Sequence, residues 1–185
     1  VGTSDFGGPN PGRILVTYTE GGFGGIDWFD ISCSERSLAA GQTVCDMDGT
    51  GFSSVRQIVA NLREGSREAF AVTHTGVYHM PDSEAAVNDV LDPAGTGIND
   101  DFPWIDITGN LFQIINTLYP SWNADDPAFR DTIPRLLRTI QVDDRYQIPD
   151  SPGVDCVVDV ASCHPLIYVG GDAGVYRSFN LGVTW

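Results

Sequence analysis

The sequence predicts an all-β chain, a partial β-propeller of four-stranded antiparallel blades with loop and short-helix insertions. Three observations predict it. The 185 residues include 21 Gly and 11 Pro spread along the chain, which is typical of many short strands joined by turns. Two stretches, 69–79 and 166–177, each contain an apolar strand, a glycine turn and a second strand that opens with Gly-Val-Tyr. A strand candidate precedes each stretch and a tryptophan-containing strand follows it, and such four-strand repeats are typical of propeller blades.

The first unit, about residues 1–54, is a degenerate copy of this repeat. Strands are expected at Arg13–Glu20 and Ile26–Ile31, on either side of a glycine-rich turn. The sequence Trp28-Phe-Asp-Ile resembles Trp104-Ile-Asp-Ile in the next unit. Because roughly three units cannot close a ring, we interpret residues 1–185 as one portion of a larger propeller.

The second unit, residues 55–108, contains the more regular pattern. Alternation of side chains predicts a strand at Val55–Leu62, then the hairpin at 69–79, and finally a strand at Pro103–Gly109 that ends at a glycine. The stretch Asp82–Asp101 is interpreted as an insertion between the hairpin and the last strand.

The third unit, residues 109–185, carries an insertion and lacks a fourth strand after Trp185. A strand is expected at Leu137–Val142, ended by a turn at Asp143-Asp144, and the hairpin at 166–177 follows. The insertion Phe112–Arg138 has apolar residues at helical spacing, which predicts two short helices or irregular turns: Leu111, Ile114, Ile115 and Leu118, then Phe129, Ile133, Leu136 and Leu137.

The stretch His164–Trp185 ends in Ser-Phe-Asn-Leu-Gly-Val-Thr-Trp. It resembles the Asp-box (BNR) repeat of the sialidase-like and WD40/YVTN-like β-propellers, Ser-x-Asp-x-Gly-x-Thr-Trp, with Asn where the family usually has Asp. The resemblance implies a hairpin turn between the third and fourth strands of a blade. Its structural residues would be Ser178, Asn180, Gly182, Thr184 and Trp185.

Proteins with this repeat include sialidases, xyloglucan-active hydrolases, sorting-receptor ectodomains and photosystem assembly factors, and the fold alone selects none of them. A sialidase needs an arginine cluster, a Tyr nucleophile and a Glu partner. Arg13-Ile14-Leu15 resembles the Arg-Ile-Pro start of that family only weakly, and no Tyr has flanking residues typical of the nucleophile. A glycosidase needs two opposed carboxylates, but candidates such as Asp106 and Asp143 do not stand out among 25 acids. No catalytic residues are predicted.

The formal charge is −15, from 25 acids and 10 bases, and all the bases are Arg. Nucleic acid is therefore a poor candidate partner, because cationic side chains supply most of the affinity for phosphates. The acidity fits either a solvated surface or a basic partner. The sequence has no apolar run long enough for a membrane span, so direct membrane insertion is not expected.

The four cysteines form two local pairs in polar, turn-rich stretches. We favour the disulfides Cys33–Cys45 and Cys156–Cys163, which would place the protein in the periplasm or outside the cell. Free thiols in a cytosolic protein are the alternative. A zinc site is disfavoured because there is no Cys-x-x-Cys spacing.

No cofactor and no metal site are predicted. Asp46, Asp48 and Thr50 have the spacing of half a calcium loop, but no Glu follows at the required distance, so an Asp-Gly turn is favoured. His74 and His79 are interpreted as strand histidines that are packed or exposed, and His164 as the start of a strand.

Aromatic residues in or near loops suggest an interface: Phe23, Trp28, Phe29, Tyr119 and Trp122. The alternative is that they cover the rim of the propeller. We predict a non-catalytic extracytoplasmic module that binds a protein partner through the insertions 82–101 and 112–138. It would be a scaffold or an accessory subunit of a larger complex, such as the membrane-anchored photosynthetic complexes suggested by the resemblance. The alternative is a carbohydrate-active hydrolase or glycan-binding protein.

Overall fold

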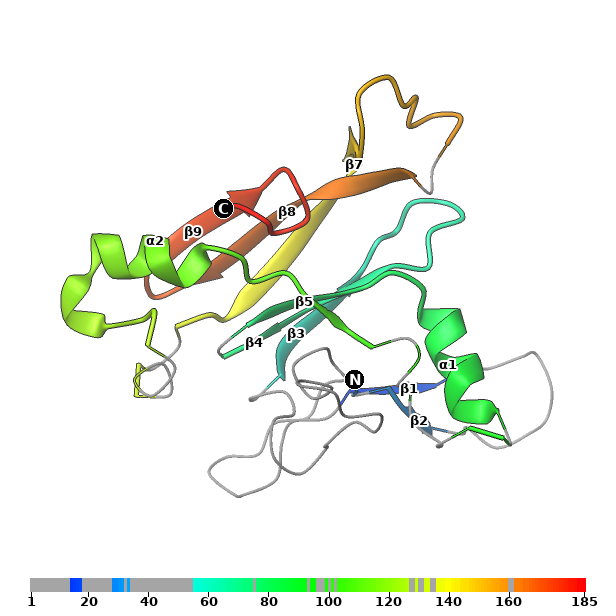
Figure 1. The fold of residues 1–185 in the computed structure, drawn as a ribbon, viewed down its shortest axis with the longest axis horizontal. Helices are drawn as coiled ribbons and strands as arrows, with labels where there is room; N and C mark the ends of the chain where they lie inside the picture. The colour runs from blue at the N-terminus through cyan, green and yellow to red at the C-terminus, as the bar shows by residue number, and fades with distance from the viewer. Residues whose placement is uncertain are drawn as a thin grey trace.

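Antiparallel strands and short helices make up the part of the chain that the computed structural model describes (Figure 1). The described residues are 14–17, 28–31, 33, 55–74, 76–92, 94–95, 99, 101, 103–126, 129, 132–133, 136–159 and 162–185. For residues 15–17 and 28–30 the backbone alone is described.

The strands form three antiparallel sheets, in each of which strands adjacent in sequence are paired. A two-stranded sheet pairs β1 (Leu15–Thr17) with β2 (Trp28–Asp30). A four-stranded sheet has the order β3 (Val55–Ala60), β4 (Ala69–Thr73), β5 (Val77–Met80) and β6 (Ile105–Asp106). A three-stranded sheet has the order β7 (Thr139–Pro149), β8 (Cys163–Gly171) and β9 (Gly174–Ser178).

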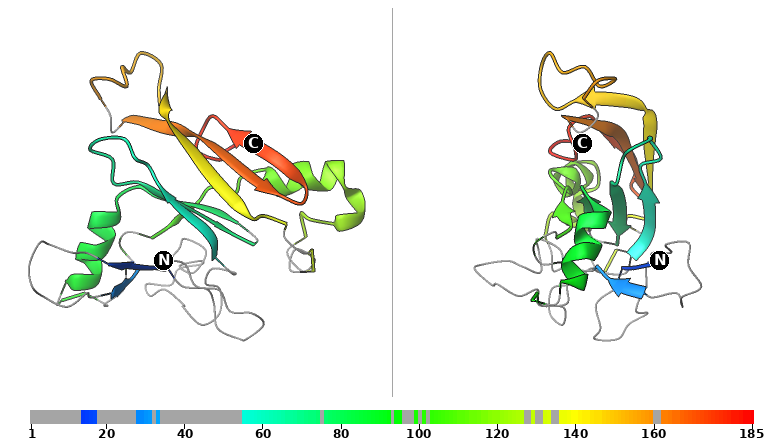
Figure 2. Two further views of the ribbon diagram at one scale, coloured as in Figure 1. Left: turned by 180° about the vertical axis from the view of Figure 1, so that it is seen from behind. Right: turned by 90° about the vertical axis from the view of Figure 1, so that its right-hand side faces the viewer.

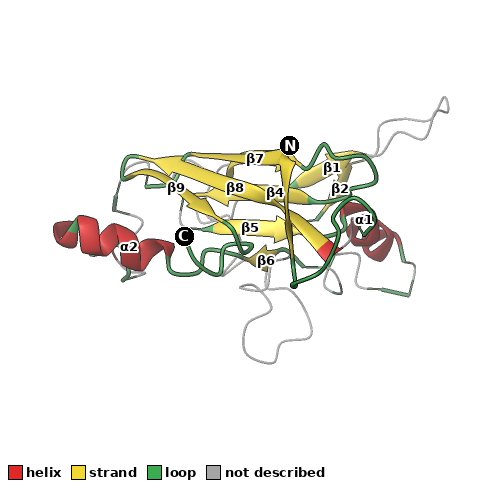
Figure 3. Cartoon of the chain, turned by 90° about the horizontal axis from the view of Figure 1, so that it is seen from above, coloured by secondary structure: helices red, strands yellow, loops and turns green. Residues whose placement is uncertain are grey.

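The two α-helices of the described ranges lie at opposite ends of the strand region, as Figures 1 and 3 both show. Helix α1 (Ser83–Leu91) begins at Asp82, whose side chain accepts hydrogen bonds from the backbone N–H groups of Glu84 and Ala85. Helix α2 (Leu111–Leu118) is followed by the 3₁₀ helix η1 (Pro120–Trp122). None of the described helices is long and apolar enough to cross a membrane.

Two hydrophobic clusters hold these elements together. The larger one joins both sheets and α2: it contains Phe70 and Val77 from the four-stranded sheet, Ile140 and Ile167 from the three-stranded sheet, and Ile115 from α2. The smaller one packs α1 against β4 and β5 around Trp104, which is fully buried. The indole N–H of Trp104 donates to the carbonyl of Ile31 at 2.7 Å, which ties in the chain after β2.

The prediction of a partial propeller is wrong. The described residues form a small mixed α/β domain with antiparallel sheets of four and three strands, a two-stranded ribbon and two helices, and none of these sheets is closed (Figure 2). The physical reason is that pairing between neighbouring strands is local, whereas the way in which sheets meet depends on distant contacts. Here one such contact is made by Gln57 on β3, whose side-chain oxygen accepts from Thr139 Oγ1 at 2.7 Å and from the Ile140 N–H at 3.0 Å on β7.

Several local predictions can be compared directly with the structure. The hairpins at 69–79 and 166–177 are confirmed, with Val72 paired to Val77 and Gly171 paired to Gly174. The helix expected from Leu111 is confirmed as α2. The turn expected at Asp143-Asp144 is wrong: β7 continues to Pro149, and a bulge between Asp143 and Gln147 absorbs the irregularity. Helix α1 lies in the stretch 82–101, where only an insertion was expected.

Candidate functional site

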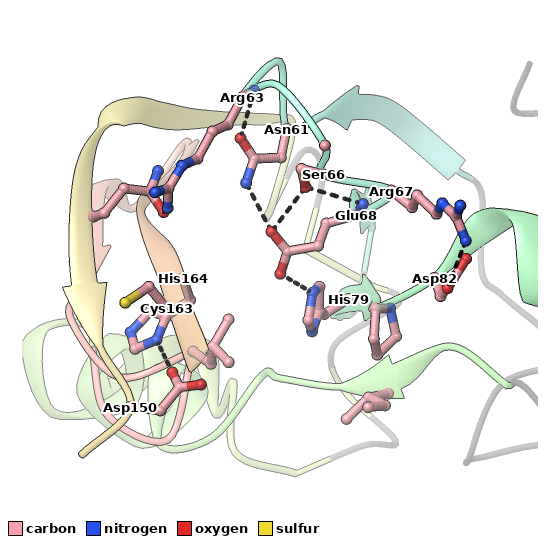
Figure 4. Close-up of a pocket in the computed structure, with 15 residues that line it drawn as sticks. Asn61, Arg63, Ser66, Arg67, Glu68, His79, Asp82, Asp150, Cys163 and His164 are labelled. Carbon is pink, nitrogen blue, oxygen red and sulfur yellow. Dashed lines mark hydrogen bonds and ion pairs between the residues drawn. The ribbon is translucent and has the colours of Figure 1, made fainter. Parts of the chain in front are cut away.

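A cavity of about 550 Å³ lies between the four-stranded and the three-stranded sheets, at the ends that carry the β3–β4 loop and the β7–β8 loop (Figure 4). Its walls come from the β3–β4 loop and β5 on one side, and from the end of β7 and the start of β8 on the other. Polar side chains predominate among the residues that line it: Asn61, Arg63, Ser66, Arg67, Glu68, His79, Asp82, Gln147, Asp150 and His164, with Gly65, Pro81, Ile105, Cys163 and Leu181.

On the four-stranded side, Glu68 and His79 form a hydrogen-bonded pair. Glu68 Oε1 lies 2.9 Å from His79 Nε2, and Glu68 Oε2 accepts from Asn61 Nδ2 at 2.7 Å and from Ser66 Oγ at 3.3 Å. The imidazole is buried and stacks on Phe70, its cross-strand neighbour, at a ring distance of 4.6 Å. Both pairing and stacking fix the ring on the cavity wall.

The hydrogen bonds around Glu68 determine its charge. Burial raises the pKa of this carboxyl, but hydrogen bonds from His79, Asn61 and Ser66, together with attraction to His79, outweigh burial. The net effect is a pKa below the ordinary value of 4.5. Glu68 is therefore an ionised acceptor at neutral pH.

On the three-stranded side, His164 is held between two acceptors. Its Nδ1 lies 2.6 Å from Asp150 Oδ1, and its Nε2 lies 3.1 Å from the carbonyl oxygen of Phe179. A carbonyl oxygen can only accept, so Nε2 carries a proton. Nδ1 faces the Asp150 carboxyl group, so both ring nitrogens have a partner and the imidazole is held in one orientation.

Arg63 connects the two sides of the cavity. Its Nη1 donates to Gln147 Oε1 at 2.9 Å, and its Nη2 donates to the carbonyl oxygen of Cys156. Both partners are neutral, and none of the described carboxylates forms an ion pair with Arg63. Arg67 differs, because it forms ion pairs with Asp82 at 3.6 Å and Glu84 at 3.0 Å.

The Cys156–Cys163 disulfide closes the loop that leads into β8. This loop carries Val157 and Val158, which are 86% and 82% exposed. Cys33 is buried and disulfide-bonded, and its expected partner, Cys45, lies outside the described residues. Disulfide bonding is compatible with an oxidising, extracytoplasmic location.

The predicted interface residues are only partly described. Tyr119 is 39% exposed and stacks on Trp122 at 4.6 Å, and Trp122 packs against the larger hydrophobic cluster. Trp28 and Phe29 belong to β2, but their side chains lie outside the described part, as does Phe23. The weak calcium candidates Asp46, Asp48 and Thr50 also lie outside it.

The residues compared with the Asp-box form a hydrogen-bonded turn after β9. Ser178 Oγ accepts from the Gly182 N–H at 2.8 Å, and Asn180 Oδ1 accepts from the Thr184 N–H at 2.9 Å. Gly182 has φ 78° and lies so close to the Ile107 backbone that a Cβ would overlap it. Trp185 donates to the carbonyl of Ile107 at 3.2 Å, so this turn joins the three-stranded sheet to the chain before α2.

The remaining candidates have structural partners outside the cavity. Asp106 accepts from the backbone N–H and the hydroxyl of Thr108, and Asp143 pairs with Arg145 at 3.0 Å. His74 is buried at the end of β4. Within the described ranges, no group of three His, Cys, Asp or Glu side chains is arranged to hold a metal ion.

The residues that line the cavity are not marked by any pattern in the sequence. His79 and His164 appear as ordinary strand residues, and Arg63, Glu68 and Asp150 appear as loop residues without a motif. The contact that joins the two sides, from Arg63 to Cys156, spans 93 positions of sequence. The sequence carries no local signal for the cavity, because its two walls come from loops that meet only in the folded chain.

No protein-family model matches the chain, and neither a curated protein nor a solved structure is significantly similar to it.

Proposed function

We propose that this protein is a non-catalytic binding module of the periplasm or the extracellular space, and that it docks on a protein partner as part of a larger complex. The observation that carries the proposal is the exposed apolar surface at the loop end, defined as residues 61–68 and 150–159. Leu62, Val157 and Val158 are each more than 80% exposed there. Exposed apolar side chains grouped at one end of a molecule are typical of interaction sites.

The loop end is held together by specific contacts. Arg63 donates to Gln147 and to the Cys156 carbonyl, so the β3–β4 loop and the loop after β7 are joined beside these side chains. The Cys156–Cys163 disulfide shortens the second loop. A preorganised surface loses less conformational entropy on binding than a loose one, which favours docking.

Charge at the loop end indicates the partner's chemistry. Glu64, Asp155 and Asp159 are exposed around the apolar residues, and the chain as a whole carries −15. An anionic lipid surface would repel this arrangement. A protein surface with an apolar centre and a basic rim complements it.

The test is affinity capture from an extract of the native source with matched variants. We expect the wild-type chain to retain one stoichiometric protein, and Leu62→Asp and Val158→Asp to lose it. Val175→Asp is the control, because Val175 is 76% exposed but lies beside the opposite end of β8, where it pairs with Gly170. Equal retention by all four chains, or no retained protein at all, would contradict the proposal.

A glycan-cleaving function is the second candidate, since Glu68 and Asp150 both line the cavity. Hydrolysis of a glycosidic bond needs a carboxylic acid that keeps its proton near neutral pH. The lowered pKa of Glu68 makes it unsuitable for that role. Hydrolysis of a glycan panel that is abolished by Glu68→Gln or Asp150→Asn would instead favour this candidate.

A further inference from the structure

We propose that the cavity between the two sheets binds a small polyhydroxylated monocarboxylate, with the Arg63 guanidinium pairing with its carboxylate. This site goes beyond the docking function and does not depend on it. Its volume of about 550 Å³ falls within the usual range for small-molecule sites, and its walls come from both sheets.

Arg63 differs from the other described arginines in its burial and in its partners. Of the arginines that the structure describes, Arg63 alone is half-buried, and the others are exposed: Arg56, Arg67, Arg138, Arg145 and Arg177. Its hydrogen bonds go to an amide oxygen and a backbone carbonyl, so its charge is not neutralised by any described carboxylate. This occurs in a chain with 25 acids and 10 bases, where a carboxylate partner would be easy to supply. A partly desolvated cation without a counter-ion is a natural site for an anionic ligand.

The two neutral contacts also prepare Arg63 for binding. They hold the guanidinium in one orientation, and a guanidinium has more N–H donors than these two bonds use. A carboxylate suits the donors that remain, because its two oxygens match the planar geometry of guanidinium N–H groups.

The acidic side chains restrict the ligand class. Glu68 and Asp150 line the same cavity, and Asp150 Oδ2 has no hydrogen-bond partner among the described residues, while Oδ1 is hydrogen-bonded to His164 Nδ1. The carboxylate oxygens of Glu68 and Asp150 are suitable acceptors for ligand hydroxyl groups. They would repel a doubly charged phosphate, so a singly charged carboxylate with several hydroxyls fits better. Ile105 and Leu181 provide apolar surface for the carbon chain.

The experiment is a calorimetric titration with three probes that share a six-carbon chain. Gluconate has both the carboxylate and the hydroxyls, sorbitol has only hydroxyls, and hexanoate has only the carboxylate. We expect saturable binding of gluconate at millimolar concentrations, with sorbitol and hexanoate each at least about tenfold weaker. Inorganic phosphate is the fourth probe, and we expect it to bind more weakly than gluconate.

Two arginine variants locate the site. Arg63→Gln removes the charge and keeps a donor, and we expect it to weaken gluconate binding by about tenfold. Arg145→Gln removes an exposed arginine that pairs with Asp143, and we expect no change. The proposal is overturned if sorbitol, hexanoate or phosphate equals gluconate, if Arg63→Gln binds like the wild type, or if no probe binds. The probe comparison needs no variant, so misfolding of Arg63→Gln would leave the proposal testable.

Discussion

The sequence Gly-Val-Tyr occurs once at β5 and once at β9, and the two strands occupy different positions in their sheets. Strand β5 lies between β4 and β6, and all four of its residues are buried. Strand β9 pairs with β8 at the edge of its sheet, and Val175 is 76% exposed there. The shared sequence pattern therefore specifies a hairpin in both regions. Whether the residues of its second strand are buried depends on what packs beside that strand, which is β6 for β5 and no described strand for β9.

The turns of the two hairpins also differ in their contacts with the rest of the chain. The largest expected change in stability follows from this difference. When the hairpins are aligned on Gly76 and Gly174, Thr73 of the first corresponds to Gly171 of the second. A Cβ at Gly171 would overlap the backbone carbonyl oxygen of Leu136. We expect Gly171→Ala to lower the free energy of unfolding by about 3 kcal/mol, because backbone must move to accommodate the methyl group.

Urea denaturation of the purified variant measures this effect. Asp172→Ala is the matched control, since Asp172 is the next residue, is exposed, and forms only a surface ion pair with Arg138 at 3.8 Å. The control should change stability by no more than about 0.5 kcal/mol. Equal stability of Gly171→Ala and the wild type would mean that Leu136 and Gly171 are not as close in solution.

The two valines of the shared sequence provide the next comparison. Val77 is fully buried in the larger cluster, whereas Val175 is mostly exposed. We expect Val77→Ala to destabilise the protein by about 2 kcal/mol through lost burial and the resulting cavity. Val175→Ala should stay within about 0.5 kcal/mol. Thermal and urea unfolding of both variants check this, and similar losses at the two sites would show that β9 is covered in solution.

These contrasts show which features the sequence could predict. Glycine turns and apolar alternation act between neighbouring residues, so both hairpins could be predicted from 69–79 and 166–177. Helix α1 could also have been found, because Asp82 is a favourable N-cap and Ala85-Ala86 favours a helix. Because the stretch 82–101 was interpreted as an insertion between strands, no helix was predicted there.

The arrangement of the sheets and the cavity could not be predicted in the same way. In a propeller and in the observed domain alike, strands that are neighbours in sequence pair antiparallel. The two folds differ in the contacts between sheets, such as the hydrogen bond from the Ile140 N–H to Gln57. The cavity depends on Arg63 reaching Cys156 and on loops of both sheets meeting at one end. No spacing rule within a single strand specifies such contacts.

The smallest expected change in stability concerns the two pairs of a carboxyl group and a histidine, Glu68 with His79 and Asp150 with His164. The two carboxyl groups differ in the number of hydrogen bonds that they accept and in their exposure. Glu68 accepts hydrogen bonds from His79, Asn61 and Ser66, whereas Asp150 bonds to His164 and is 46% exposed. Because the folded-state pKa of Glu68 lies below its ordinary value of 4.5, this residue stabilises the fold above that pH. Its contribution is lost as the pH falls through the folded-state pKa.

Glu68→Gln tests this difference through the pH dependence of stability. We expect the variant to be less stable than the wild type by about 1 kcal/mol at neutral pH, because the amide accepts fewer and weaker hydrogen bonds. The gap should narrow as the pH falls below 4.5, where the wild-type carboxyl becomes protonated. Glu84→Gln, which removes an exposed partner of Arg67, should follow the wild-type profile. A stability difference between Glu68→Gln and the wild type that stays constant across this pH range would show that Glu68 stabilises the fold through its shape and not through its charge. The argument that Glu68 is too acidic to be the proton donor of a glycosidase would then fail as well.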